Sequence, residues 1–131
     1  MWGRECCTVF NRRLEGEMRR EAFEPTVLEG VHWQGGGAVR DRKQPTDGNV
    51  AVYIPFSVKA DRPYRPPRAY AACSEGSWTL REGDLLCLGA HPEPVPSARA
   101  LLERGGVVTI VSVSENGFGS RALRHWEVCA R

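Results

Sequence analysis

The sequence predicts a mainly β protein, namely a small antiparallel β-barrel or sandwich of six to seven strands with one short helix and long polar loops. Three observations support this fold class. Residues 50–58 alternate with the period of a strand, residues 107–130 hold two strand-like runs around an Asn-Gly pair, and further short apolar runs are bounded by glycine, proline or charged residues.

The chain of 131 residues has the size of one domain, so we expect a single β-barrel domain over residues 1–131. Its 41% hydrophobic and 26% charged residues are typical of a globular protein and exclude disordered or collagen-like chains. No run approaches the roughly 18 apolar residues of a membrane span, and the first residues lack the order of a secretory signal. We therefore expect no membrane contact and a cytoplasmic origin.

Residues 50–58 give the clearest strand, because their apolar positions all fall on one face: Val50, Val52, Ile54, Phe56 and Val58. Pro55 has no backbone N–H for a ladder hydrogen bond, so this strand is expected at a sheet edge or with a bulge near that residue.

The end of the chain predicts a hairpin. Residues 107–114 are rich in β-branched side chains, and residues 124–130 alternate apolar and polar positions. Asn116-Gly117 between them tolerates the positive φ of a tight turn. Further strands are expected at residues 6–10, 26–33 and 84–88, with a partner strand near residues 77–80.

The connections are polar. Residues 12–24 are almost wholly charged and predict a solvated hairpin arm or loop. Residues 35–48 begin with three glycines but lack the Gly-Lys-Ser/Thr of a phosphate loop, so we expect a flexible loop. The one predicted helix covers residues 98–104, with Leu101 and Leu102 facing the core. With about two turns it must pack on the sheet, for example at one end of a barrel.

No metal site or cofactor is predicted. The cysteines are odd in number and have no paired C-x-x-C spacing, so we expect buried or half-buried free thiols at Cys6, Cys7, Cys73, Cys87 and Cys129. The three histidines, His32, His91 and His125, lie far apart in the sequence.

Residues 59–70 have the most unusual local composition. Three prolines favour a polyproline-like course with about three residues per turn, which would place Arg62, Arg65 and Arg68 along one side. With Tyr64 and Tyr70 between them, this row has the chemistry to follow a nucleic-acid backbone and stack on bases. Two other interpretations stay open: a solvated connection, and an arm that docks on an acidic neighbouring subunit. The net charge of only +2 means that any basic site is local.

No catalytic signature is present, and we do not expect an enzyme. His125 and Glu127 share a strand face two residues apart, which favours a surface hydrogen bond or a subunit interface over an acid/base pair. Trp2, beside the chain end, is expected to need a partner surface.

The strand His125-Trp126-Glu127-Val128 resembles the ending of small minor capsid or head-to-tail joining proteins of tailed bacteriophages and prophages. The order of features is similar over most of the chain. An early charged hairpin precedes a strand ending in Tyr53-Ile54-Pro55, then a Gly83-Asp84 turn leads into a strand before the terminal hairpin.

This resemblance implies a structural virion protein, a head-closure or stopper-like subunit of a homo-oligomeric ring in the neck, assembled in the cytoplasm of the bacterial host. Such a ring closes the portal channel and joins head to tail, so the expected partners are portal or adaptor proteins, tail proteins and, through non-specific contact, packaged DNA. The family has no catalytic residues or cofactors to carry over. The alternative function is an OB-like small barrel that binds single-stranded nucleic acid, which requires exposed aromatic side chains on one sheet face.

Overall fold

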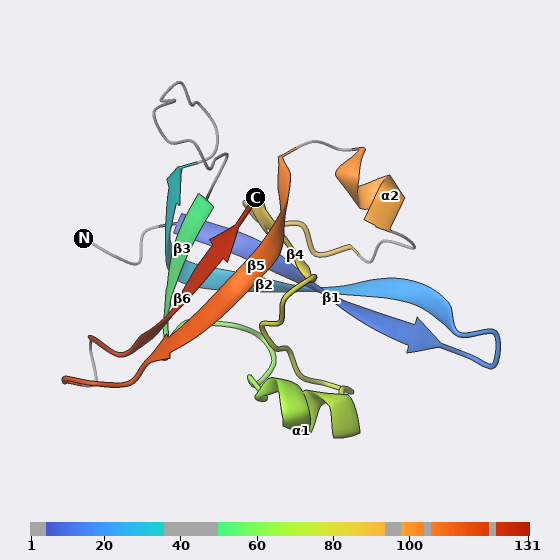
Figure 1. Ribbon diagram of the computed structural model, residues 1–131, viewed down its shortest axis with the longest axis horizontal. Coiled ribbons are helices and arrows are strands. Elements are labelled where there is room, and N and C mark those ends of the chain that lie inside the picture. Colours follow the sequence, from blue (N-terminus) through green and yellow to red (C-terminus); the bar gives the residue numbers. More distant parts are fainter. Residues whose placement is uncertain (1–4, 36–49, 94–97, 104–105, 121–122) are drawn as a thin grey trace.

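Six antiparallel strands form a closed barrel in the computed structural model, which describes residues 5–35, 50–93, 98–103, 106–120 and 123–131 (Figure 1). The predicted fold class is therefore confirmed, with the barrel rather than the sandwich. The strands are β1 (Glu5–Glu15), β2 (Arg20–Gly35), β3 (Val50–Pro55), β4 (Leu85–Leu88), β5 (Val107–Asn116) and β6 (His125–Ala130). Their order around the barrel is β1-β2-β3-β6-β5-β4, and β4 pairs again with β1.

The barrel interior is filled by one face of each strand. Val50, Val52 and Ile54 of β3 are buried as the alternation predicts, and they meet the inner faces of the other strands. Trp78 and Leu80 complete this core from the segment before β4. The other members of the core are Cys7, Val9, Leu28, Val31, Leu86, Ile110, Trp126, Val128 and Ala130.

A second, smaller cluster lies outside the barrel wall and is covered by helix α2 (Ala98–Leu102). Leu101 of α2 is fully buried, against Phe10, Phe23, Leu85 and Cys87. The predicted inward orientation of Leu102 is wrong, because that side chain is 49% exposed. Five residues of helix present only a narrow face to the sheet, which Leu101 and Ala100 occupy.

Strand β3 ends earlier than predicted. Its pairing with β2 stops at Tyr53, and Pro55 pairs only with His125 of β6, so the proline lies where its missing N–H costs no ladder hydrogen bond. Beyond it the chain turns, with the Val58 N–H donating to Pro55 O (2.9 Å). Phe56 is consequently 39% exposed instead of lying on the inner strand face.

Residues 77–80 are buried but do not form the predicted partner strand, and their only bridge among the described residues joins Trp78 to Tyr64. A second helix, α1 (Pro67–Ala72), replaces the predicted polyproline-like course at the end of residues 59–70. Pro67 is favourable there because the first turn of a helix needs no N–H donor from it.

Two hairpins project from the barrel at opposite ends of its longest axis (Figure 1). The β1–β2 hairpin confirms the predicted charged arm and is paired without a break from Cys6 to its last pair, Glu15 and Arg20. The β5–β6 hairpin confirms the predicted C-terminal pairing, with Asn116 opposite His125. Its connection is longer than the tight Asn-Gly turn expected from the sequence, because eight residues, 117–124, separate the two strands.

Candidate functional site

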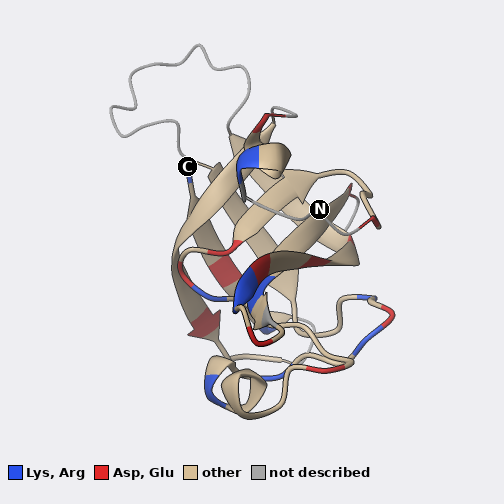
Figure 2. Cartoon of the chain, turned by 90° about the vertical axis from the view of Figure 1, so that its right-hand side faces the viewer, with Lys and Arg blue, Asp and Glu red and all other residues tan. Residues whose placement is uncertain are grey.

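The predicted row of three arginines is not a continuous basic surface. Arg62 donates to Glu24 of β2 (Nη2–Oε2 3.2 Å), and Arg65 donates to the Cys73 carbonyl (2.8 Å). Arg68 lies on α1 and is exposed. Figure 2 views the molecule from the arm end and shows basic and acidic residues interleaved over the described part of the chain. The first two guanidiniums thus stabilise this chain's own fold.

The two tyrosines of the same segment point into the protein. Tyr70 is 2% exposed, and the Arg81 guanidinium lies 4.9 Å from its ring centre. Tyr64 is half-buried against Trp78 and Trp126. Burial raises the pKa of both phenols, and the nearby carboxylate of Glu115 adds to the effect on Tyr64. The Tyr70 ring therefore offers no face for base stacking, and the Tyr64 ring is partly covered by the two tryptophans.

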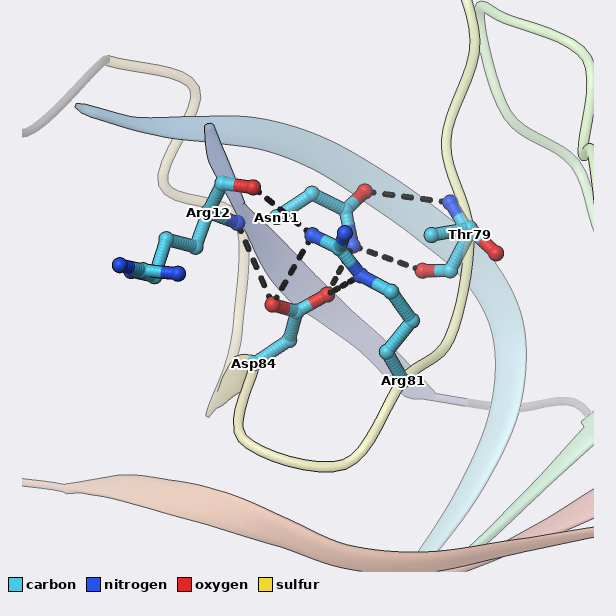
Figure 3. Close-up of polar contacts among 5 residues, drawn as sticks. All are labelled: Asn11, Arg12, Thr79, Arg81 and Asp84. Atoms are coloured by element: carbon cyan, nitrogen blue, oxygen red, sulfur yellow. Dashed lines mark hydrogen bonds and ion pairs between the residues drawn. The ribbon is translucent and has the colours of Figure 1, made fainter. Parts of the chain in front are cut away.

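The base of the β1–β2 arm is fixed by a polar cluster around the buried Asp84, which we call the clasp: Asn11, Arg12, Thr79, Arg81 and Asp84 (Figure 3). The Asp84 carboxylate is 4% exposed and accepts from both Nε and Nη2 of Arg81, at 3.0 and 3.2 Å. It also accepts from Asn11 Nδ2 (2.8 Å) and from the Arg12 backbone N–H (3.2 Å). These four hydrogen bonds offset much of the free-energy cost of burying the carboxylate.

The clasp also connects the arm to the segment before β4. Asn11 exchanges two hydrogen bonds with the Thr79 backbone, donating from Nδ2 (2.8 Å) and accepting at Oδ1 (3.1 Å). Arg81 Nη2 donates to the Arg12 carbonyl (2.8 Å). These bonds link residues about seventy positions apart, so the arm has a fixed direction relative to the barrel. The expected Gly83-Asp84 turn is present, with Gly83 at φ +93°, but its long-range partners were not predicted.

The far end of the arm is exposed. Met18 is 76% exposed and Leu14 is 42% exposed. The turn places Arg19 at φ +53°, a left-handed conformation that favours glycine, while the Arg19 N–H donates to Gly16 O (3.1 Å). We call residues 17–20 the arm tip.

The opposite end of the molecule carries the most exposed aromatic ring of the described residues. Phe118 is 84% exposed and Leu123 is 60% exposed, both in the connection between β5 and β6. Phe56 lies beside this connection, since its N–H donates to the Arg124 carbonyl (3.1 Å), and its ring packs on Trp126 at 4.6 Å. We call Phe56, Tyr64, Glu115, Phe118 and Leu123 the aromatic end.

The predicted interface residues of β6 differ in exposure. His125 is 8% exposed, contacts the Tyr53 ring edge-on at 5.8 Å, and donates from Nδ1 to the Leu123 carbonyl (2.9 Å). Glu127 is half-buried opposite Tyr53. Trp2 lies outside the described residues, as does the loop after Gly35.

All five cysteines are free, but Cys73 and Cys129 are exposed rather than buried or half-buried as expected. Burial raises the pKa of the Cys7 thiol well above its usual value. Within the described residues no three metal-ligating side chains come together, and no helix there is long and apolar enough to cross a membrane. A surface groove lies between β1, β2 and Lys59, with Glu5, Cys6 and Glu29 on its walls.

The fold and these surfaces together define a small, filled antiparallel β-barrel with two projecting ends, each of which exposes large apolar side chains. The chain belongs to DUF6751, a family of unknown function, whose model matches residues 4–131. No curated protein and no solved structure matches the chain.

Proposed function

We propose that the protein is a structural subunit of a tailed phage or prophage particle, which assembles with copies of itself into a ring in the neck and joins head to tail. One observation carries the proposal: two hairpins project at opposite ends of the longest axis, and each exposes large apolar side chains (Figure 1). Apolar side chains at such positions gain nothing for the isolated chain and favour burial by a partner.

The positions of the two ends favour head-to-tail contacts. When different surfaces of identical subunits meet, the assembly either closes into a ring or continues as a filament. The clasp supports this role, because a hairpin that reaches a neighbour must keep a fixed direction. The resemblance of His125-Trp126-Glu127-Val128 and of the feature order to head-to-tail joining proteins supplies the place of the ring, the neck.

Fewer arginines are free to contact packaged DNA than the sequence predicted. Arg62 and Arg65 are engaged within the chain, which leaves Arg68 as the exposed member of the predicted row. The alternative of a single-stranded nucleic-acid-binding module has less support, because Tyr70 is buried and Tyr64 packs on two tryptophans. We therefore favour a subunit contact for residues 60–72, with Arg68 as the residue that faces a partner or DNA.

Deletion of the gene from an inducible prophage that carries it tests the proposal. Electron microscopy of the lysate is expected to show DNA-filled heads and free tails that are not joined, and a plasmid copy of the gene is expected to restore joined particles. Normal joined particles after deletion would overturn the proposal. A gene that lies far from portal, capsid and tail genes would also count against it.

A further inference from the structure

The aromatic end has the chemistry of a receptor for a basic side chain. Glu115 is exposed and stands opposite Trp126 in the β5–β6 ladder, close enough to Tyr64 for its charge to act on that phenol. The rings of Phe56 and Tyr64 both pack on Trp126, at 4.6 and 4.4 Å. Aromatic faces beside a carboxylate attract a guanidinium through cation–π and ionic contacts together.

The apolar part of the same end lies next to these groups. Phe118 and Leu123 belong to the connection that follows β5, and Leu123 lies within van der Waals distance of where a side chain at Gly119 would be. A flexible apolar side chain from a partner would pack on Phe118, and methionine is well suited to contact an aromatic ring. The aromatic end therefore fits a partner segment with an apolar residue next to arginine.

The arm tip has that composition. It contains Glu17, Met18, Arg19 and Arg20, all exposed. Glu21, the next acidic residue, is already engaged by Arg12 (Nε–Oε2 2.6 Å), so it does not neutralise the two arginines of the tip. The left-handed backbone of Arg19 is a conformation that glycine adopts without strain. An arginine at this position is explained if its guanidinium binds a partner.

The arm tip and the aromatic end lie far apart on one chain, at opposite ends of the longest axis (Figure 1). They therefore cannot satisfy each other within the chain, but they can do so between two chains in a head-to-tail arrangement. The arm tip has a net charge of +1 from Arg19, Arg20 and Glu17, and the aromatic end exposes Glu115 together with Arg124. Arg19 and Glu115 are therefore a pair of exposed groups of opposite charge.

We infer that the arm tip of one copy docks on the aromatic end of a second copy, with Arg19 against Glu115 and the adjoining rings, and Met18 against Phe118. This inference rests on the proposed function, since it names the contact that would build the ring. The occupant of the aromatic end is therefore a second copy of this chain.

Photo-cross-linking of the purified chain tests the contact directly. The variant Met18→p-benzoylphenylalanine is irradiated in an equal mixture of isotopically light and heavy protein, and cross-linked peptides are identified by mass spectrometry. We expect links between copies from position 18 to residues 115–124 or to Phe56. Links confined to other segments would overturn the inference. So would a chain that gives no link and stays monomeric at millimolar concentration, which would leave the aromatic end to a different protein.

Charge reversal gives a second, independent measurement by sedimentation equilibrium. Arg19→Glu and Glu115→Arg are each expected to weaken self-association at least tenfold, and the double variant is expected to recover most of that loss because its charges again oppose each other. Glu103→Arg, at the exposed residue that follows α2, is the matched control and is expected to leave the association constant unchanged. Single reversals that change it less than twofold would overturn the inference.

Arg19→Gly separates contact from folding, because glycine accepts the positive φ at this turn. It is expected to weaken association about fivefold with an unchanged circular dichroism spectrum. The two proposals fail separately: unaltered association in the reversal variants rejects this contact, whereas joined particles after gene deletion reject the neck function even where the cross-link forms.

Discussion

The base and the tip of the β1–β2 arm belong to the same hairpin but differ in what holds their residues in place. At the base, Asp84 is nearly fully buried and has four hydrogen-bond donors from three residues. At the tip, Met18 is 76% exposed and Arg19 has a backbone conformation that favours glycine. The base is explained by the stability of this chain, whereas nothing within the described chain explains the composition of the tip.

This difference separates two kinds of residue. Substitutions at the base are expected to lower the free energy of unfolding, because they leave buried polar atoms without partners. Replacement of Arg19 by glycine at the tip is expected to increase stability slightly, while it weakens contact with a partner. The following predictions test this contrast, beginning with the largest effect.

Asp84→Ala is expected to lower the free energy of unfolding by about 2–4 kcal/mol, measured by urea denaturation. The substitution leaves the Asn11 amide without its carboxylate partner and the Arg81 guanidinium without its counter-charge, in a partly buried position. Glu82→Ala, at the exposed neighbouring position, is the control and should change stability by less than about 0.5 kcal/mol. Equal effects of the two substitutions would mean that the clasp does not stabilise the arm.

Alkaline pH is expected to lower the free energy of unfolding of the protein through Cys7, which lies on β1 within the barrel. Cys7 is fully buried and its thiol has a raised pKa, so above about pH 9 the unfolded chain loses this proton while the folded chain keeps it. Because the unfolded state then binds fewer protons, the free energy of unfolding falls by up to about 1.4 kcal/mol per pH unit for this group.

Urea midpoints at pH 8 and pH 10 measure this effect. Cys7→Ala should cost stability at both values through the lost packing, but it should flatten the decline between them. The same decline in the variant as in the natural chain would show that other groups, such as the phenols of Tyr64 and Tyr70, dominate the pH dependence.

The sequence predicted the base of the arm only in part. Alternation in residues 50–58 predicted the core strand, and the charged composition of residues 12–24 predicted a hairpin arm or loop, because both signals are local in the sequence. The clasp was not predictable in this way, since Asn11 and Asp84 meet across 73 positions and no local motif relates one to the other. The Gly-Asp turn marked the position of Asp84 but gave no sign of its partners.

The segment with three prolines shows the opposite failure, in which a local rule was applied too far. Proline fixes φ and favours an extended course, but Pro67 also suits the first turn of a helix, and α1 forms there. Tertiary contacts decided the outcome: Tyr70 is buried on this helix beneath Arg81, and Arg62 is held by Glu24. Sequence alone placed the tyrosines beside the arginines but did not predict that their rings are buried.

Tyr70→Phe tests whether that burial depends on the ring or on the hydroxyl group. The Tyr70 Oη is buried and has no hydrogen-bond partner among the described residues, so its removal is expected to raise the free energy of unfolding by up to about 1 kcal/mol. The ring contact with Arg81 would remain. Thermal denaturation is a suitable measurement, and a loss of more than about 1 kcal/mol would indicate that the hydroxyl group has a partner.

Arg19→Gly produces the smallest change in stability and the sharpest test of the contrast between base and tip. Relief of the left-handed conformation favours the variant, while the greater freedom of glycine in the unfolded chain opposes it, so a net gain of about 0.5 kcal/mol is expected. Arg20→Gly is the matched control, because Arg20 begins β2 without a positive φ and its replacement should cost about 0.5–1 kcal/mol. Opposite signs at adjacent arginines, measured by urea denaturation, would show that Arg19 lowers the stability of the arm tip. A loss of stability in both variants would mean that Arg19 stabilises the hairpin. The backbone conformation of Arg19 would then no longer indicate that the arm tip binds a partner.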